Sequence, residues 1–195
     1  MLNFELFLII LVSYLFGSIP FGLLLTKIFL KKDIREIGSG NIGATNVLRA
    51  GNKILGYSTL VLDILKAVLP ILYIKFFMND YLYISALSIF IGHVFPIWLK
   101  FKGGKGVASY LGILFCLDIV TALIFGVVWI SVFILFKFSS LSSLLASLTI
   151  PIFHFFYNSN SDYYFYFMMF ILIFFTHREN IKRLRNNTES KSKIY

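Results

Sequence analysis

Three short polar segments carry the residues of this chain whose types and spacing could do chemistry. They are Gly38–Asn46, Lys100–Gly106 and His177–Arg183, and each stands between long apolar runs. Glycine leaves backbone N–H groups open to a close ligand, hydroxyl and amide side chains add donors, and Lys or Arg adds positive charge. This combination suits phosphate, so the three segments predict sites for phosphate-bearing molecules.

The first segment resembles a Walker A loop, with Gly38 and Gly43 at the motif's spacing and Thr45 in its hydroxyl position. Ala44 replaces the essential lysine, which argues against a nucleoside triphosphatase. What remains is a glycine-rich loop with hydroxyl and amide donors, followed by Arg49 one helical turn beyond Thr45. A flexible interfacial linker is the alternative interpretation, because glycine alone is ambiguous.

In the second segment Gly103, Gly104 and Gly106 surround Lys105 where a helix is expected to start at Val107. An anion at that point would gain from backbone amides, from the helix dipole and from the lysine charge. The alternative is that the lysines only fix the loop at the membrane surface and reach the lipid headgroups.

The third segment places His177 and Asn180 three residues apart, on one face if the last apolar span continues as a helix. That face could meet a polar ligand. A basic tail after the last span is the alternative for Lys182, Arg183 and Arg185.

Composition decides what kind of protein must position these segments. The chain has 195 residues, of which 58% are hydrophobic and only 14% charged, too apolar for a soluble core with a polar surface. The net charge of +9 comes from basic residues beside apolar runs, which fits anionic lipid headgroups better than nucleic acid. Cys116, the single cysteine, excludes an intrachain disulfide and is expected to be a small buried hydrophobe.

Seven membrane-spanning helices are predicted. The spans are Asn3–Thr26, Ile54–Phe77, Tyr81–Leu99, Val107–Leu117, Ile119–Phe136, Leu141–Tyr157 and Tyr163–Thr176, with turns at Asn79-Asp80, Asp118, Ser139-Ser140 and Asn158–Asp162. The fourth span is short, so one long helix over Val107–Phe136 is the alternative. Seven spans put every Lys and Arg except Lys66 and Lys75 in or beside a cytoplasmic loop.

The predicted fold is therefore an all-α integral membrane protein with its N-terminus outside and its C-terminus in the cytoplasm. It is expected to form a single domain, residues 1–195, with a cytoplasmic-side site. The first span reads as an uncleaved anchor, since Glu5 stands where a signal peptide would carry basic residues.

Polar residues inside the spans have mainly structural interpretations. Ser18 and Pro20 are expected to break the first helix, and His93 and Pro96 to bend the third. Asp63 and Lys66 lie three apart in the second helix and are expected to neutralise one another, with a role in the site as the alternative.

The whole chain resembles the bacterial membrane family of acyl-phosphate:glycerol-3-phosphate acyltransferases. The resemblance rests on Gly-Ser-Ile-Pro-Phe-Gly from Gly17, the first segment with Arg49, Gly-His-Val-Phe-Pro from Gly92, Lys-Phe-Lys-Gly-Gly-Lys-Gly-Val-Ala from Lys100, and His-Arg-Glu-Asn-Ile-Lys-Arg-Leu from His177, at the family's spacing. One departure is Asn187, where the family usually has glycine two residues before Glu189. Asparagine tolerates the left-handed conformation, so the turn is expected to survive.

The resemblance implies acyl transfer from acyl phosphate to the 1-hydroxyl of glycerol 3-phosphate in phospholipid biosynthesis, with lysophosphatidic acid and phosphate as products. It implies a polar site with Ser39, His177 and Asn180 as catalytic residues. Its substrate-binding residues would be Arg49, Lys105, Thr45, Asn46, Gly40, Gly43, Gly103 and Gly104. Acyl phosphate is already an activated mixed anhydride, so positioning and charge stabilisation suffice and no metal, cofactor or catalytic triad is expected.

A transporter or binding protein for an organic phosphate is the rival class. It predicts inverted repeats and polar residues near the membrane midplane, whereas here the polar residues cluster at one interface and no repeat is visible. A lipid-phosphate phosphatase is a further alternative. The expected location is the bacterial inner membrane, while chain-length preference, oligomeric state and the use of thioester donors are left open.

Overall fold

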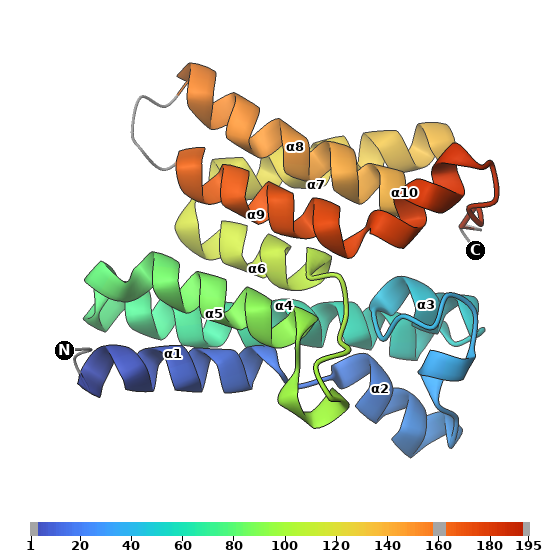
Figure 1. The fold of residues 1–195 in the computed structure, drawn as a ribbon, viewed down its shortest axis with the longest axis horizontal. Helices are drawn as coiled ribbons and strands as arrows, with labels where there is room; N and C mark the ends of the chain where they lie inside the picture. Colours follow the sequence, from blue (N-terminus) through green and yellow to red (C-terminus); the bar gives the residue numbers. More distant parts are fainter. Residues whose placement is uncertain (1–3, 158–162, 193–195) are drawn as a thin grey trace. The chain divides into compact units, whose positions relative to one another are not determined.

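The computed structural model describes residues 4–157 and 163–192, and every regular element in those ranges is helical (Figure 1). The prediction of an all-α protein is confirmed for this part of the chain. By packing, the chain divides into two units, Met1–Leu117 and Asp118–Tyr195. The single functional domain over residues 1–195 stays a prediction.

Unit 1 is a bundle in which α5 packs on α1, α4 and α6, and α4 also packs on α6 (Figure 1). Its helices are α1 (Phe4–Gly17), α2 (Phe21–Leu25), α3 (Ala44–Arg49), α4 (Lys53–Phe77), α5 (Leu82–Val94) and α6 (Val107–Leu117). A π-helical turn, η1 (Thr26–Leu30), and short 3-10 turns η2 (Ile34–Glu36), η3 (Asn79–Tyr81) and η4 (Ile97–Leu99) connect them. The backbones of α1 and α5 approach closely, because a Cβ at Gly17 or Gly92 would overlap a backbone carbonyl of the other helix.

Prolines set two helix boundaries in unit 1. The predicted break in the first helix is confirmed, since α1 ends at Gly17 and α2 starts at Phe21, just after Pro20. The third predicted helix is shorter than expected, because α5 ends at Val94. Pro96 disfavours the helical conformation at the residue before it, Phe95, and only a 3-10 turn follows.

Unit 2 is built on α8, which packs against both α7 and α9. Its helices are α7 (Ile119–Phe136), α8 (Ser139–Tyr157), α9 (Tyr163–Thr176) and α10 (Arg178–Arg185). The break at Asp118 is confirmed, because its carboxylate caps α7 by accepting the N–H groups of Val120 at 3.2 Å and Thr121 at 2.8 Å. The predicted turn at Asn158–Asp162 lies outside the described residues.

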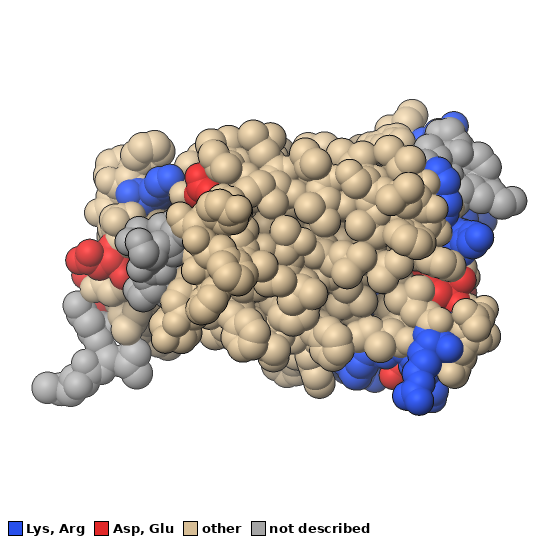
Figure 2. Space-filling view, turned by 90° about the horizontal axis from the view of Figure 1, so that it is seen from above, with Lys and Arg blue, Asp and Glu red and all other residues tan. Residues whose placement is uncertain are grey.

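Four stretches of the described chain are long and apolar enough to cross a membrane: Phe4–Leu30, Asn79–Leu99, Ile119–Phe136 and Ser139–Tyr157. The helices Val107–Leu117 and Tyr163–Thr176 are apolar but shorter, and α4 has 25 residues but carries buried charges. On the face drawn in Figure 2, the Lys, Arg, Asp and Glu atoms gather at opposite ends of a broad zone that lacks them. This distribution fits a protein embedded in a bilayer.

Lys75, which lies outside the three polar segments, hydrogen-bonds the C-terminal end of a neighbouring helix. Its Nζ donates to the carbonyl oxygen of Cys116 at 2.6 Å, near the end of α6. A lysine at a helix C-terminus satisfies an exposed carbonyl and complements the helix dipole. Cys116 is buried, as expected.

Candidate functional site

The first two polar segments lie at the same end of unit 1, where the chain joins α2 to α4 and α5 to α6 (Figure 1). A small apolar cluster fixes both of them. It consists of Leu23, Ile34, Ile42, Val47 and Leu55, with Leu99 packed against it. Both segments therefore lie at one end of unit 1, while the placement of all three segments on one membrane face stays a prediction.

Asn46 ties the first segment together. Its Nδ2 lies 3.1 Å from the carbonyl oxygen of Ile34, 2.9 Å from that of Ile37 and 2.8 Å from that of Asn41, and its Oδ1 accepts the Ser39 N–H at 2.9 Å. The side chain is 1% exposed. Its amide therefore organises the loop backbone, while the role in binding substrate that the resemblance implies stays a prediction.

Two glycines give the loop its path around this amide. Gly38 and Gly40 have φ angles of 59° and 70°, in the left-handed region that disfavours other residues. A Cβ at Gly38 would also overlap Oδ1 of Asn46. In this structure Gly40 thus allows the backbone conformation of the loop, and its role in binding substrate stays a prediction.

The three candidate side chains of this segment are more accessible than Asn46. Ser39 is exposed, while Thr45 and Arg49 are half-buried and lie one turn apart on α3. Gly43 immediately precedes that helix in extended conformation. The sequence did not predict α3 as a separate helix, although Arg49 does lie one helical turn after Thr45, as expected.

The glycines around Lys105 serve close packing. The N–H of Gly103 donates to the carbonyl of Val94 at 3.0 Å, and that of Gly104 donates to the carbonyl of His93 at 3.1 Å. Both N–H groups are thus bonded to carbonyls at the end of α5. The prediction that they are open to bind an anion is therefore wrong. Half-buried Lys105 itself remains the anion-binding candidate of this loop.

In unit 2 the third segment forms the end of α9 and all of α10. His177 is 2% exposed and its Nδ1 lies 2.8 Å from the carbonyl oxygen of Ile173. Since a carbonyl only accepts, Nδ1 carries a proton and donates it to this oxygen. Its backbone is no longer helical, so α9 does not continue directly into α10.

Asn180 belongs to a network around Glu189. Oε1 of Glu189 accepts from Nδ2 of Asn180 at 2.7 Å and from the Ser140 hydroxyl at 2.8 Å, and Oε2 accepts from Nε of Arg183 at 2.6 Å. Burial favours the neutral carboxyl, but these hydrogen bonds outweigh it and hold the pKa of Glu189 below its ordinary value. A carboxylate thus fixes the Asn180 amide. Ser140 lies on α8 and was not predicted as part of this site, because nothing in the sequence links it to Glu189.

The departure at Asn187 is accommodated as expected. Asn187 has a φ angle of 56°, and the N–H of Thr188 donates to the carbonyl of Arg183 at 2.8 Å. The N–H of Asn187 donates to the carbonyl of Leu184 at 3.2 Å. These two bonds form a Schellman motif at the end of α10, which returns the chain toward Glu189.

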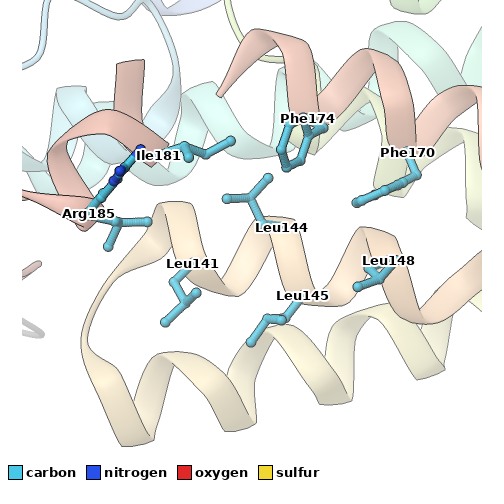
Figure 3. A pocket seen from close by; sticks show the side chains of 9 residues that line it. Leu141, Leu144, Leu145, Leu148, Phe170, Phe174, Ile181 and Arg185 are labelled. Atoms are coloured by element: carbon cyan, nitrogen blue, oxygen red, sulfur yellow. The ribbon is translucent and has the colours of Figure 1, made fainter. Parts of the chain in front are cut away.

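An apolar groove of about 380 Å³ runs between α8, α9 and α10 (Figure 3). It is lined by Leu141, Leu144, Leu145, Leu148, Phe170, Phe174, Ile181, Leu184 and Arg185. Arg185 is the one charged residue in this lining and lies at one end of it (Figure 3). Such a groove suits a hydrocarbon chain that carries an anionic head.

Within the described residues, then, the two segments at one end of unit 1 carry Ser39, Thr45, Arg49 and Lys105. In unit 2, His177 immediately precedes α10, and Asn180 lies in the first turn of that helix. The described residues contain no group of three or more His, Cys, Asp or Glu side chains placed to hold a metal ion. The available chemistry is that of cations, hydroxyls, amides and one imidazole.

Known proteins match almost the whole chain. The family model described as glycerol-3-phosphate acyltransferase matches residues 7–187. A glycerol-3-phosphate acyltransferase of Pelagibacter ubique is 63% identical over 98% of this chain and 100% of its own length. One of Rhodopseudomonas palustris, strain HaA2, is 48% identical over 93% of each chain.

Solved structures agree with these relatives. The crystal structure of PlsY (YgiH), an integral membrane glycerol 3-phosphate acyltransferase in its glycerol 3-phosphate form, is similar with a TM-score of 0.90 at 36% identity. The match covers 96% of this chain and 95% of that one. Its lysophosphatidic acid form has a TM-score of 0.86. The chain belongs to the glycerol-3-phosphate acyltransferase family.

Proposed function

We propose that this protein transfers a fatty acyl group from acyl phosphate to the 1-hydroxyl of glycerol 3-phosphate, an early step of phospholipid biosynthesis. The observation that carries the proposal is the near full-length similarity to PlsY, whose crystal forms contain glycerol 3-phosphate and lysophosphatidic acid. The polar segments support it, because both substrates are phosphates and those segments supply cations and hydroxyls. Acyl phosphate as donor is the family's expected chemistry.

Arg49 and Lys105 bind the phosphate of the acceptor in this proposal. Both belong to the same end of unit 1, and both side chains are half-buried, where a charged hydrogen bond is stronger than in water. The hydroxyls of Ser39 and Thr45 add donors. Asn46 and the glycines hold the loop that presents them.

His177 and Asn180 orient the reacting groups. The Ile173 carbonyl fixes the imidazole of His177, and Glu189 fixes the amide of Asn180, so both side chains are ordered before substrate binds. In this proposal the imidazole of His177 hydrogen-bonds the acceptor hydroxyl.

The transfer is direct. The 1-hydroxyl oxygen forms a bond to the acyl carbonyl carbon while the bond from that carbon to the phosphate oxygen breaks. The hydroxyl proton ends on the departing phosphate, so the products are lysophosphatidic acid and inorganic phosphate. The protein contributes orientation and stabilisation of the developing negative charge.

Seven spans, with the N-terminus outside and the C-terminus and the site at the cytoplasmic face of the inner membrane, complete the proposal. Basic residues around Arg49, Lys102 and Arg183 favour that orientation. Labelling of single cysteines with a membrane-impermeant reagent should mark position 79 from outside and position 102 only after permeabilisation. Labelling of both from the same side would contradict the topology.

Donor use tests the function itself. Purified protein in lipid nanodiscs would receive radiolabelled glycerol 3-phosphate with palmitoyl phosphate, palmitoyl-CoA or palmitoyl-acyl-carrier protein. We expect labelled lysophosphatidic acid with palmitoyl phosphate and one phosphate released for each acyl group transferred. Activity with the thioesters alone, or none with any donor, would reject the proposal.

A further inference from the structure

A buried polar cluster in unit 1 contacts the loop that carries Lys105. It consists of Asp63, Lys66, His93 and Ser109. Asp63 and Lys66 on α4 form an ion pair of 2.8 Å, with side chains 4% and 2% exposed, which confirms that they pair. Lys66 also donates to the carbonyl oxygen of Ile19, at the break between α1 and α2, at 2.7 Å. An ion pair so deep in a helical bundle is costly unless its geometry is satisfied by further hydrogen bonds.

His93 connects this ion pair to α6. Its Nδ1 lies 3.8 Å from Oδ1 of Asp63 and 3.2 Å from the hydroxyl of Ser109. That hydroxyl is also 3.2 Å from the backbone carbonyl of Asp63, to which it can only donate. Ser109 therefore accepts from His93, so Nδ1 carries the ring proton and the ring orientation is fixed.

The other side of the ring supports the glycine loop. A Cβ at Gly104 would overlap Nε2 of His93, so the Gly104 backbone rests on that nitrogen. The carbonyl of His93 also accepts the Gly104 N–H at 3.1 Å. Lys105 is the next residue, and its backbone position therefore depends on where the ring of His93 lies.

We propose that His93 is a positioning residue for acyl transfer: held by Ser109 and the Asp63–Lys66 pair, it sets the loop from which Lys105 reaches the acceptor phosphate. The inference rests on the proposed function, in which Lys105 binds glycerol 3-phosphate. It gives the buried charges of α4 a task that helix packing alone does not require. Loss of the support displaces Lys105, which weakens acceptor binding and leaves the donor untouched.

Two variants and a matched control test this. Ser109→Ala removes the hydroxyl that orients His93, whereas Ser88→Ala removes a buried hydroxyl that only donates to Ile84 within α5, at 2.7 Å. We expect Ser109→Ala to raise KM for glycerol 3-phosphate about threefold to tenfold, and His93→Ala at least about tenfold. KM for acyl phosphate and the melting temperature of Ser109→Ala should match those of Ser88→Ala.

A double-mutant cycle separates positioning from general damage. Lys105→Ala should raise KM for glycerol 3-phosphate about tenfold or more, and adding His93→Ala to it should cost less than about twofold further. Full additivity, or equal acceptor KM values for Ser109→Ala and Ser88→Ala, would overturn the inference while Lys105 keeps its role. An unchanged acceptor KM in Lys105→Ala would instead reject the proposed acceptor site, and the inference with it.

Discussion

The polar ends of the two units each depend on a buried asparagine, but the partners of these asparagines differ. In unit 1, Asn46 holds backbone: three carbonyl oxygens and the N–H of Ser39 surround its amide. In unit 2, Asn180 is held by a side chain, the carboxylate of Glu189, which Arg183 and Ser140 also bond. The first end is a backbone loop shaped by one amide, and the second is a network of side chains around one charge.

This difference determines how each end responds to mutation. A backbone carbonyl cannot be exchanged, so a defect at Asn46 has no compensating substitution. A network of side chains can be rebuilt with donors and acceptors interchanged. The same residue type therefore has two distinct tasks in one protein.

The largest effect is expected for Asn46→Asp. The new carboxylate would face the carbonyl oxygens of Ile34, Ile37 and Asn41 without a hydrogen to donate. We expect a loss of at least about a hundredfold in kcat/KM, because buried acceptors are left unsatisfied and repelled. Steady-state kinetics on protein that elutes as a single species would measure it; retention of wild-type activity would show that Asn46 does not organise the loop.

Asn180→Asp should cost about tenfold to thirtyfold in kcat/KM, since two carboxylates would then meet at 2.7 Å in the wild-type geometry. Here rescue is expected. Adding Glu189→Gln restores one donor and one acceptor at the contact, and the double variant should recover to within about fivefold of the wild type. If the double variant is as poor as the product of its single variants, Asn180 and Glu189 do not act as a pair.

Acid should loosen unit 2 through Glu189. Its pKa is lowered in the folded protein, so the ionised carboxylate contributes stability at neutral pH that is lost as pH falls through the ordinary glutamic acid range and below it. The difference in melting temperature between wild type and Glu189→Gln should therefore shrink below about pH 4. A difference independent of pH would mean that the charge of Glu189 is not stabilising.

The smallest effect concerns Asn187, which has a φ angle of 56° at the end of α10. Asn187→Val should destabilise by about 1 kcal/mol, because a β-branched residue resists the left-handed conformation, whereas Asn187→Gly should change stability by less than about 0.5 kcal/mol. Thermal melting of both variants measures this. Equal melting temperatures would contradict the assigned turn.

Much of the fold could be predicted from hydrophobic runs and turn residues. The bounds of α6, α7 and α9 match the predicted spans, because Asp118 and the flanking polar residues stop each run sharply. The helix α3 was missed because it is short and follows glycines. The pairing of Asp63 with Lys66 was correct, since spacing and the cost of a lone charge in lipid leave little choice.

The candidate site could be predicted by residue type but not by hydrogen-bond direction. Asn46 and the glycines at 103 and 104 have the chemistry of phosphate ligands, yet the structure directs Asn46 and both glycine N–H groups at neighbouring backbone. Ser140 meets Glu189 only because α8 and the C-terminal segment come together in unit 2. Such contacts depend on packing between distant segments, which no local pattern encodes.

In the proposed mechanism both polar ends position substrates, and no residue of the protein carries the acyl group. Intact-mass analysis of the purified protein with acyl phosphate and no acceptor, combined with two-substrate kinetics, tests this most directly. We predict an unmodified mass and intersecting double-reciprocal lines, as expected for transfer within a ternary complex. An acyl adduct on Ser39 together with parallel double-reciprocal lines would contradict direct transfer and indicate a covalent acyl-enzyme.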